Sequence, residues 1–82
     1  MVSLRAPADQ ASASEVRDQV REVVAEMPAH LREILRLAYF HQMAYQDIAH
    51  SLEIPVGTVK SRLHAAVGTF AKLWKQRHEP QP

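Results

Sequence analysis

The sequence predicts an all-α protein of about four helices, and three observations support this fold class. Apolar residues recur at steps of three and four, which is the spacing of one face of an α-helix. Strand signals are missing, because no alternation of apolar and polar residues persists and the two glycines form no hairpin turn. A chain of 82 residues also buries only about 60% of its unfolded surface, enough for one thin core.

The first helix is predicted to follow Ser12. Ser12 and Glu15 have the spacing of a capping box, in which each side chain accepts a hydrogen bond from the other residue's backbone N–H. An apolar stripe follows at helical spacing: Val16, Val20, Val23, Val24 and Met27. The residues before this helix are rich in Ala and Ser, so we divide the chain into a flexible lead-in or linker (1–14), one domain (15–78) and a disordered tail (79–82).

A second helix is predicted after Pro28, which ends the first helix and suits the first turn of the next. Its inner face has the same spacing and comprises Leu31, Ile34, Leu35 and Ala38. Leu37 and Phe40 add a second apolar edge, and together with Tyr39 they form the candidate surface for a protein partner. Ordinary packing between helices explains this edge equally well. Residues 41–43 form a short connection.

The last two helices are predicted to be a short one and a long one. The inner face of the short helix comprises Tyr45, Ile48, Ala49 and Leu52. Residues 53–54 form the turn, and Pro55 stands where a helix can begin. The long helix is predicted to bury Val56, Val59, Leu63, Ala66, Val67, Phe70 and Trp74. A short helix, a tight turn and a longer helix constitute the plan of a helix-turn-helix, whose second helix enters the major groove of DNA.

The polar face of the long helix carries the candidate DNA-binding residues. Three side chains opposite the apolar stripe can donate hydrogen bonds to base edges: Lys60, Ser61 and His64. Gly57 and Thr58 begin the helix, where free backbone N–H groups favour a phosphate. Arg62 lies at the flank, from which it reaches the DNA backbone.

Charge alone does not identify the partner. The formal net charge is only +1, but residues 55–78 contain five basic side chains and no acidic one. A segment this one-sided suits a polyanion, although a charge run by itself more often marks a solvated helix face. The spacing of the two helices therefore carries the DNA interpretation.

Two strings, MPAHLREILRLAYF and AYQDIAHSLEIPVGTVKSRLHAA, resemble region 4 of bacterial sigma factors, most closely the extracytoplasmic-function group. The run IPVGTVKSRLH is far more specific than a generic helix-turn-helix pattern. The resemblance implies recognition of the −35 promoter element and docking on the β flap of the RNA polymerase core. It also implies, for many members, inhibition by an anti-sigma factor. It places the three base-facing residues, and the backbone contacts Thr58 and Arg62, at matching positions.

The sequence departs from the family pattern at three places. Glu53 stands where the family often has Gly, at a turn position that favours positive φ. Ala44 stands where the family often has Ser, so a helix N-cap is lost. Residues 65–67 are Ala, Ala and Val where the family has Arg residues, and fewer phosphate contacts imply weaker DNA binding that depends less on salt.

Other classes of function lack the residues that they need. Cysteine is absent, the five histidines have no spacing typical of metal ligands, and no Gly-rich phosphate loop or nucleophile elbow occurs. We therefore expect no enzyme activity, cofactor or metal. No apolar run is long enough to cross a membrane, so we expect no membrane insertion and a cytoplasmic location. Trp74, within a basic segment, is assigned to the core rather than to a membrane surface.

Two further functions stay open at this stage. An independent helix-turn-helix regulator would dimerise on a palindrome, whereas a sigma region is expected to be a monomer unless a partner binds it. A protein-interaction module would retain a DNA-binding face that has lost its function, as the missing Arg residues would allow. The promoter-melting domain of sigma factors has no counterpart here, and the Ala/Ser-rich start favours an excised domain over a free-standing relative.

Overall fold

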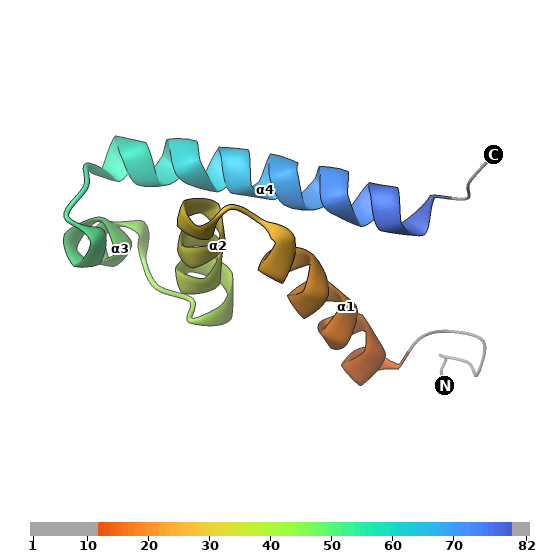
Figure 1. The fold of residues 1–82 in the computed structure, drawn as a ribbon. Coiled ribbons are helices and arrows are strands. Elements are labelled where there is room, and N and C mark those ends of the chain that lie inside the picture. The colour runs from red at the N-terminus through yellow and green to blue at the C-terminus, as the bar shows by residue number, and fades with distance from the viewer. Residues whose placement is uncertain (1–11, 80–82) are drawn as a thin grey trace, which may run out of the picture.

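The computed structural model describes residues 12–79, and this part of the chain consists of helices and short connections (Figure 1). The elements in order are α1 (Ala13–Glu26), α2 (Ala29–Leu35), the π-helical turn η1 (Arg36–Phe40), α3 (Tyr45–Leu52) and α4 (Val56–His78). The prediction of an all-α fold with about four helices is confirmed. Residues 1–11 of the expected lead-in and residues 80–82 of the expected tail lie outside the described residues.

The long helix α4 runs along one side of the protein, and the other three helices lie on the opposite side of the core (Figure 1). Helices α1, α2 and α3 all pack against α4. The arrangement leaves one side of α4 without a neighbouring helix along its length. That side is where the sequence places the candidate DNA-binding residues.

Helix α1 begins with the predicted capping box. The Ser12 N–H donates to Glu15 Oε1 at 2.9 Å, and the Glu15 N–H donates to Ser12 Oγ at 3.2 Å. The helix therefore starts at Ala13, two residues before the expected domain boundary. Val16 was expected on the buried stripe, but it lies in the first turn of α1 and is 39% exposed.

Helix α2 passes directly into a π-helical turn, which the sequence analysis did not predict. The His41 N–H donates to the Arg36 carbonyl oxygen at 3.0 Å, five residues back along the chain. A π-turn places one more residue in the turn than an α-helix does, and such turns are frequent at functional sites. As a result, Tyr39 and Phe40 leave the buried face of α2, with 55% and 50% of their surface exposed.

The ends of α3 confirm two predictions made from the family pattern. Ala44 is the N-cap residue and makes no side-chain capping hydrogen bond. Glu53 adopts the left-handed conformation, with φ 58° and ψ 47°. The N–H groups of Glu53 and Ile54 donate to carbonyl oxygens of α3, at 3.3 Å to His50 and 3.0 Å to Ala49. This left-handed residue turns the chain sharply into α4, as a glycine commonly does.

The core lies between α4 and the other helices. Its buried residues are Val23, Val24, Met27, Leu31, Ile34, Leu35, Ile48, Ala49, Val59, Leu63 and Ala66. Two residues expected in the core are exposed instead, namely Tyr45 (43%) and Val67 (45%). Val67 follows the buried Ala66 by about 100° around the helix and therefore lies at the edge of the buried face of α4. Tyr45 is the first residue of α3 and lies at the edge of the contact with α4.

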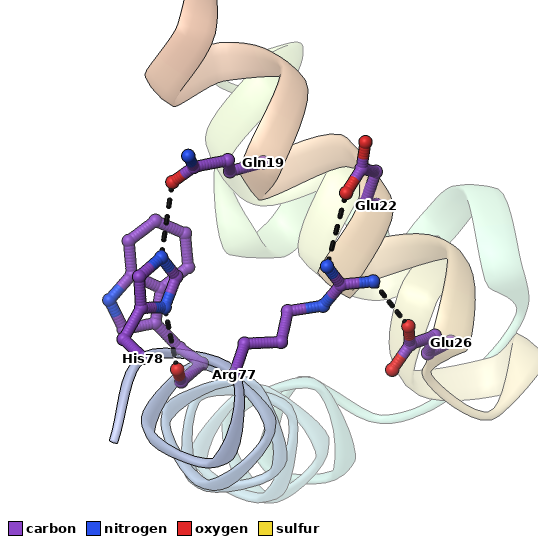
Figure 2. Close-up of polar contacts among 6 residues, drawn as sticks. Gln19, Glu22, Glu26, Arg77 and His78 are labelled. Carbon is purple, nitrogen blue, oxygen red and sulfur yellow. Dashed lines mark hydrogen bonds and ion pairs between the residues drawn. The ribbon is translucent and has the colours of Figure 1, made fainter. Parts of the chain in front are cut away.

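The far end of α4 is joined to α1 by a cluster of polar contacts (Figure 2). Arg77 contacts Glu22 at 3.1 Å and Glu26 at 2.6 Å. His78 Nε2 lies 3.1 Å from Gln19 Oε1. The Nδ1–H of the same ring donates to the carbonyl oxygen of Trp74, one turn earlier in α4, at 2.8 Å. The hydrogen bond to Glu26 raises the pKa of Arg77 above its ordinary value, as do the charges of both carboxylates, so this side chain stays charged.

Aromatic stacking continues the cluster toward the middle of α4. The Trp74 ring lies 4.1 Å from the His78 ring and 5.7 Å from the Phe70 ring, measured between centroids. Trp74 and Phe70 are half-buried, and Phe70 packs against the core. Trp74 was expected in the core, but it is half-buried, stacks on two rings of its own helix and is not among the apolar residues packed against the core. In residues 12–79, no helix is long and apolar enough to cross a membrane.

The left-handed residue at the turn gives a test of the fold. We expect Glu53→Gly to raise the free energy of unfolding by about 1 kcal/mol, because a Cβ is costly in this conformation. For a domain of this size that change raises Tm by about 4–8 °C. Glu53→Ala is the matched control, since it removes the charge but keeps the Cβ. Equal midpoints for the two variants in thermal unfolding would contradict backbone strain at this residue.

The ion pairs of Arg77 predict where the protein opens first. We expect Arg77→Gln to speed hydrogen exchange of the α1 amides and to leave the buried amides of α3 unchanged, since α1 loses a link to α4. Arg21→Gln is the control, because Arg21 pairs only within α1, with Asp18 at 3.6 Å. Hydrogen exchange followed by mass spectrometry measures the effect. Equal exchange rates of the α1 amides in the two variants would show that the ion pairs of Arg77 do not hold α1 against α4.

Candidate nucleic-acid interface

Helices α3 and α4 form the helix-turn-helix that the sequence predicts. Three turn residues (53–55) join them, and Ile48 of α3 and Val59 of α4 are completely buried. This packing fixes the angle between the two helices. It also determines the rotation of α4 about its axis, because Val59, Leu63 and Ala66 must face the core.

The three residues predicted to face bases share the solvent side of α4. Lys60, Ser61 and His64 are all exposed. They lie within about 6 Å of one another along the helix axis, given the rise of about 1.5 Å per residue. The structure therefore brings the predicted residues together on one protruding face, within the length that a major groove accommodates.

The residues predicted to contact the DNA backbone lie beside this face. Gly57 is exposed, whereas Thr58 and Arg62 are half-buried. Pro55 is the N-cap residue, and its carbonyl oxygen accepts hydrogen bonds from Thr58 and Val59 at 3.0 and 3.2 Å. A Cβ on Gly57 would meet nothing within 4 Å, so packing within the protein does not require a glycine at this position.

The structure divides the basic run of α4 into two parts. Lys75 pairs with Glu79 at 3.5 Å, and Arg77 pairs with two carboxylates of α1. Within residues 12–79, Lys60 and Arg62 form no ion pair. Arg77 is also about 25 Å from Lys60 along the helix, at about 1.5 Å per residue. Within residues 12–79 Lys72 forms no ion pair either, but it is about 18 Å from Lys60 along the helix. Two of the three unpaired cations of the run are thus at the helix-turn-helix end.

A shallow hollow lies beside the residues predicted to face bases. It has a volume of about 310 Å³ and is lined by Tyr39, Tyr45, Lys60, Leu63, His64 and Val67. Helical periodicity places Tyr45 and Val67 in the core and therefore does not predict this hollow. The exposure of Tyr45 could have been expected from its place as the first residue of a short helix, because neighbouring helices cover a terminal turn only partly.

A separate apolar groove lies between α1, η1 and α4. Its volume is about 270 Å³, and its lining residues are Val20, Val24, Leu35, Tyr39, Phe40, Val67 and Phe70. Tyr39 and Phe40 of the predicted partner-binding edge line this groove. Leu37 does not, because it is half-buried and lines another hollow with His30 and Arg36. The residues of the predicted partner-binding edge are therefore divided between two surfaces. Only the groove lined by Tyr39 and Phe40 is largely apolar.

The described part of the chain contains no cluster of side chains that could bind a metal ion. No group of three or more His, Asp or Glu side chains is placed to hold a metal ion within residues 12–79. The base-facing His64 and the cluster residue His78 are far apart on α4, and each has its own surroundings.

Comparison with known proteins agrees with the geometry. Residues 17–69 match the family described as "Sigma-70, region 4". The chain is 38% identical over 52 residues to the RNA polymerase sigma-H factor of Pseudomonas aeruginosa, covering 63% of the chain and 27% of that protein. It is 31% identical over 58 residues to the ECF RNA polymerase sigma factor SigW of Bacillus subtilis, covering 71% of the chain and 31% of that protein.

A third relative gives the same result. The ECF RNA polymerase sigma-E factor of Haemophilus influenzae is 32% identical over 60 residues, which cover 73% of this chain and 32% of that protein. The chain thus matches between about a quarter and a third of the length of these relatives. The matched residues include the whole of the helix-turn-helix turn and most of α4.

Proposed function

Because the chain belongs to the sigma-70 region 4 family, we propose that it recognises a −35 promoter element and helps to recruit RNA polymerase. One observation carries the DNA part of this proposal. The packing of α3 on α4 presents a polar, positively charged face whose cations have no acidic partner within residues 12–79. A face of this kind at a helix-turn-helix is suited to the major groove of DNA.

The proposed roles divide between reading bases and positioning the helix. Lys60 and His64 donate to acceptors on base edges, and Ser61 contacts either a base edge or a phosphate. Phosphate contacts come from Thr58, Arg62 and the backbone at Gly57, where the missing side chain lets a strand of DNA approach closely.

The DNA affinity of this chain by itself is expected to be low. Lys60 and Arg62 are the only cations on the proposed interface, so about two counterions are released and the dependence on salt is shallow. Glu53 adds a negative charge at the turn before α4. A second contact, to the polymerase, is therefore needed to hold the chain at a promoter.

The apolar groove is the proposed site of the polymerase contact. Tyr39 and Phe40 are half exposed and line it, as an amphipathic helix of a partner would require. We assign this groove to the flap of the polymerase β subunit. An anti-sigma factor that covers the groove would prevent recruitment, and this is the regulation that we propose. The same groove favours the alternative of a protein-interaction module with a weakened DNA face.

Replacement of Lys60 tests the DNA interface. We expect Lys60→Ala to weaken binding to a duplex selected from a random library about tenfold, through the loss of a contact to a base. The slope of log K against log salt should also fall, by up to about 1, because the charge of Lys60 in the groove neutralises nearby phosphates and releases a counterion. Lys72→Ala is the matched control, because Lys72 is exposed on the same helix but far from the proposed interface. Fluorescence anisotropy measures both variants, and equal effects would exclude a specific role for Lys60.

Replacement of Phe40 tests the polymerase contact. We expect Phe40→Ser to reduce capture of purified core polymerase by the immobilised chain at least fivefold and to leave DNA binding unchanged, since the groove loses an aromatic wall. Val16→Ser is the control, because Val16 is exposed and apolar but does not line the groove. Undiminished capture by Phe40→Ser would remove the groove from the proposed mechanism.

A further inference from the structure

Tyr45 was predicted on the buried face of α3, but it lies at the surface. It is the first residue of α3, and 43% of its surface is exposed. It lines the shallow hollow together with Lys60 and His64, which come from α4. The aromatic side chain of one helix therefore lies next to the proposed base-reading residues of the other.

The phenol hydroxyl of Tyr45 is available to an external partner. Among the hydrogen bonds within residues 12–79, none involves this hydroxyl. A phenol O–H is a good donor, and tyrosine hydroxyls commonly donate to phosphate oxygens in protein–DNA complexes. Unlike the ammonium of Lys60, which lines the same hollow, a phenol hydroxyl is an uncharged donor.

We propose that Tyr45 is a positioning residue of the DNA interface, whose hydroxyl donates a hydrogen bond to a phosphate beside the bases read from α4. The proposal rests on the function proposed above. It adds a contact from α3 to contacts that otherwise come from α4 alone. Two helices that hold one strand from different directions fix the depth and the tilt of α4 in the groove.

The charges around the hollow explain why a neutral donor suits this position. Asp47 is exposed in the first turn of α3, two residues after Tyr45, and its carboxylate repels a phosphate. Lys60 on the other side attracts one. Residues 65–67 offer no cation along the rest of this part of α4. A hydrogen bond from an uncharged hydroxyl adds affinity there without a further cation.

Tyr45 and Tyr39 are not equivalent, although both line the hollow. Tyr39 also lines the apolar groove and forms part of the wall between the two depressions. Tyr45 lines the hollow with Lys60 and His64 but does not line the apolar groove. The phosphate contact is therefore assigned to Tyr45, and Tyr39 provides a matched control in which the same hydroxyl is removed a short distance away.

Salt dependence separates the proposed contact from a charged one. The charge of a lysine in the groove also neutralises nearby phosphates and releases a counterion, so the loss of Lys60 lowers the slope of log K against log salt by up to about 1. A neutral hydroxyl releases none. We expect Tyr45→Phe to weaken DNA binding about three- to tenfold at every salt concentration and to leave the slope unchanged. Because a phosphate carries no sequence information, the loss should be the same for selected and unrelated duplexes.

The experiment measures the binding of four proteins to a duplex selected from a random library, between 50 and 200 mM salt. The proteins are the unmodified 82-residue chain, Tyr45→Phe, Tyr39→Phe and Lys60→Ala. Thermal unfolding of each variant accompanies the binding curves, and Tyr45→Phe is expected to keep the midpoint because the ring remains. We expect the line of log K against log salt to shift in parallel to weaker binding for Tyr45→Phe. The line should become less steep for Lys60→Ala and stay unchanged for Tyr39→Phe.

Each other outcome overturns the proposal in a distinguishable way. An unchanged affinity of Tyr45→Phe beside a weakened Lys60→Ala removes Tyr45 from the interface and leaves the interface standing. Equal losses for the two tyrosine variants, or a lowered Tm for Tyr45→Phe, indicate a structural effect and not a phosphate contact. If Lys60→Ala binds as well as the unmodified chain, the proposed DNA interface fails, and the role of Tyr45 fails with it.

Discussion

The contact between Ile34 of α2, Ile48 of α3 and Val59 of α4 is the constraint on which the rest of the structure depends. All three side chains are completely buried, and they belong to one core cluster. Burial of an aliphatic side chain of this size contributes about 1.5–3 kcal/mol, which is a large share of the stability of a small domain. Because the contact joins three helices, it sets both the angle of the helix-turn-helix and the side of α4 that faces solvent.

The two ends of α4 use positive charge for different purposes. At the far end, Arg77 is bound by Glu22 and Glu26, and this cluster draws α1 against α4 (Figure 2). At the near end, Lys60 and Arg62 lack an acidic partner within residues 12–79. A single basic segment in the sequence is thus partly structural and partly available for binding, and only the second part supports the proposed role.

The two proposed binding surfaces are neighbours, and a shared wall separates them. Tyr39 and Val67 line both the apolar groove and the hollow beside the base-reading residues. The π-helical turn η1 brings Tyr39 to this position, because its wider turn moves two aromatic residues off the buried face of α2. One irregular turn therefore shapes a protein-binding groove and one side of the proposed DNA interface.

The sequence by itself determined the features that depend on neighbours along the chain. The capping box at Ser12 follows from local hydrogen bonding. The uncapped start of α3 at Ala44 and the left-handed residue Glu53 follow from the positions at which the sequence departs from the family pattern. The solvent side of α4 was predictable as well, since the helical period places Lys60 and His64 opposite a stripe that must be buried.

The tertiary structure alone decided which parts of each stripe a neighbouring helix covers. Helical periodicity assigns Tyr45 and Val67 to apolar faces, but it contains no information on where the neighbouring helix ends, and both residues are exposed. The ion pair between Arg77 and Glu22 could not be predicted from helical periodicity either, because the two residues are 55 positions apart in the chain. Coverage and long-range pairing depend on how helices are placed relative to one another, and a period measured within one helix cannot fix that placement.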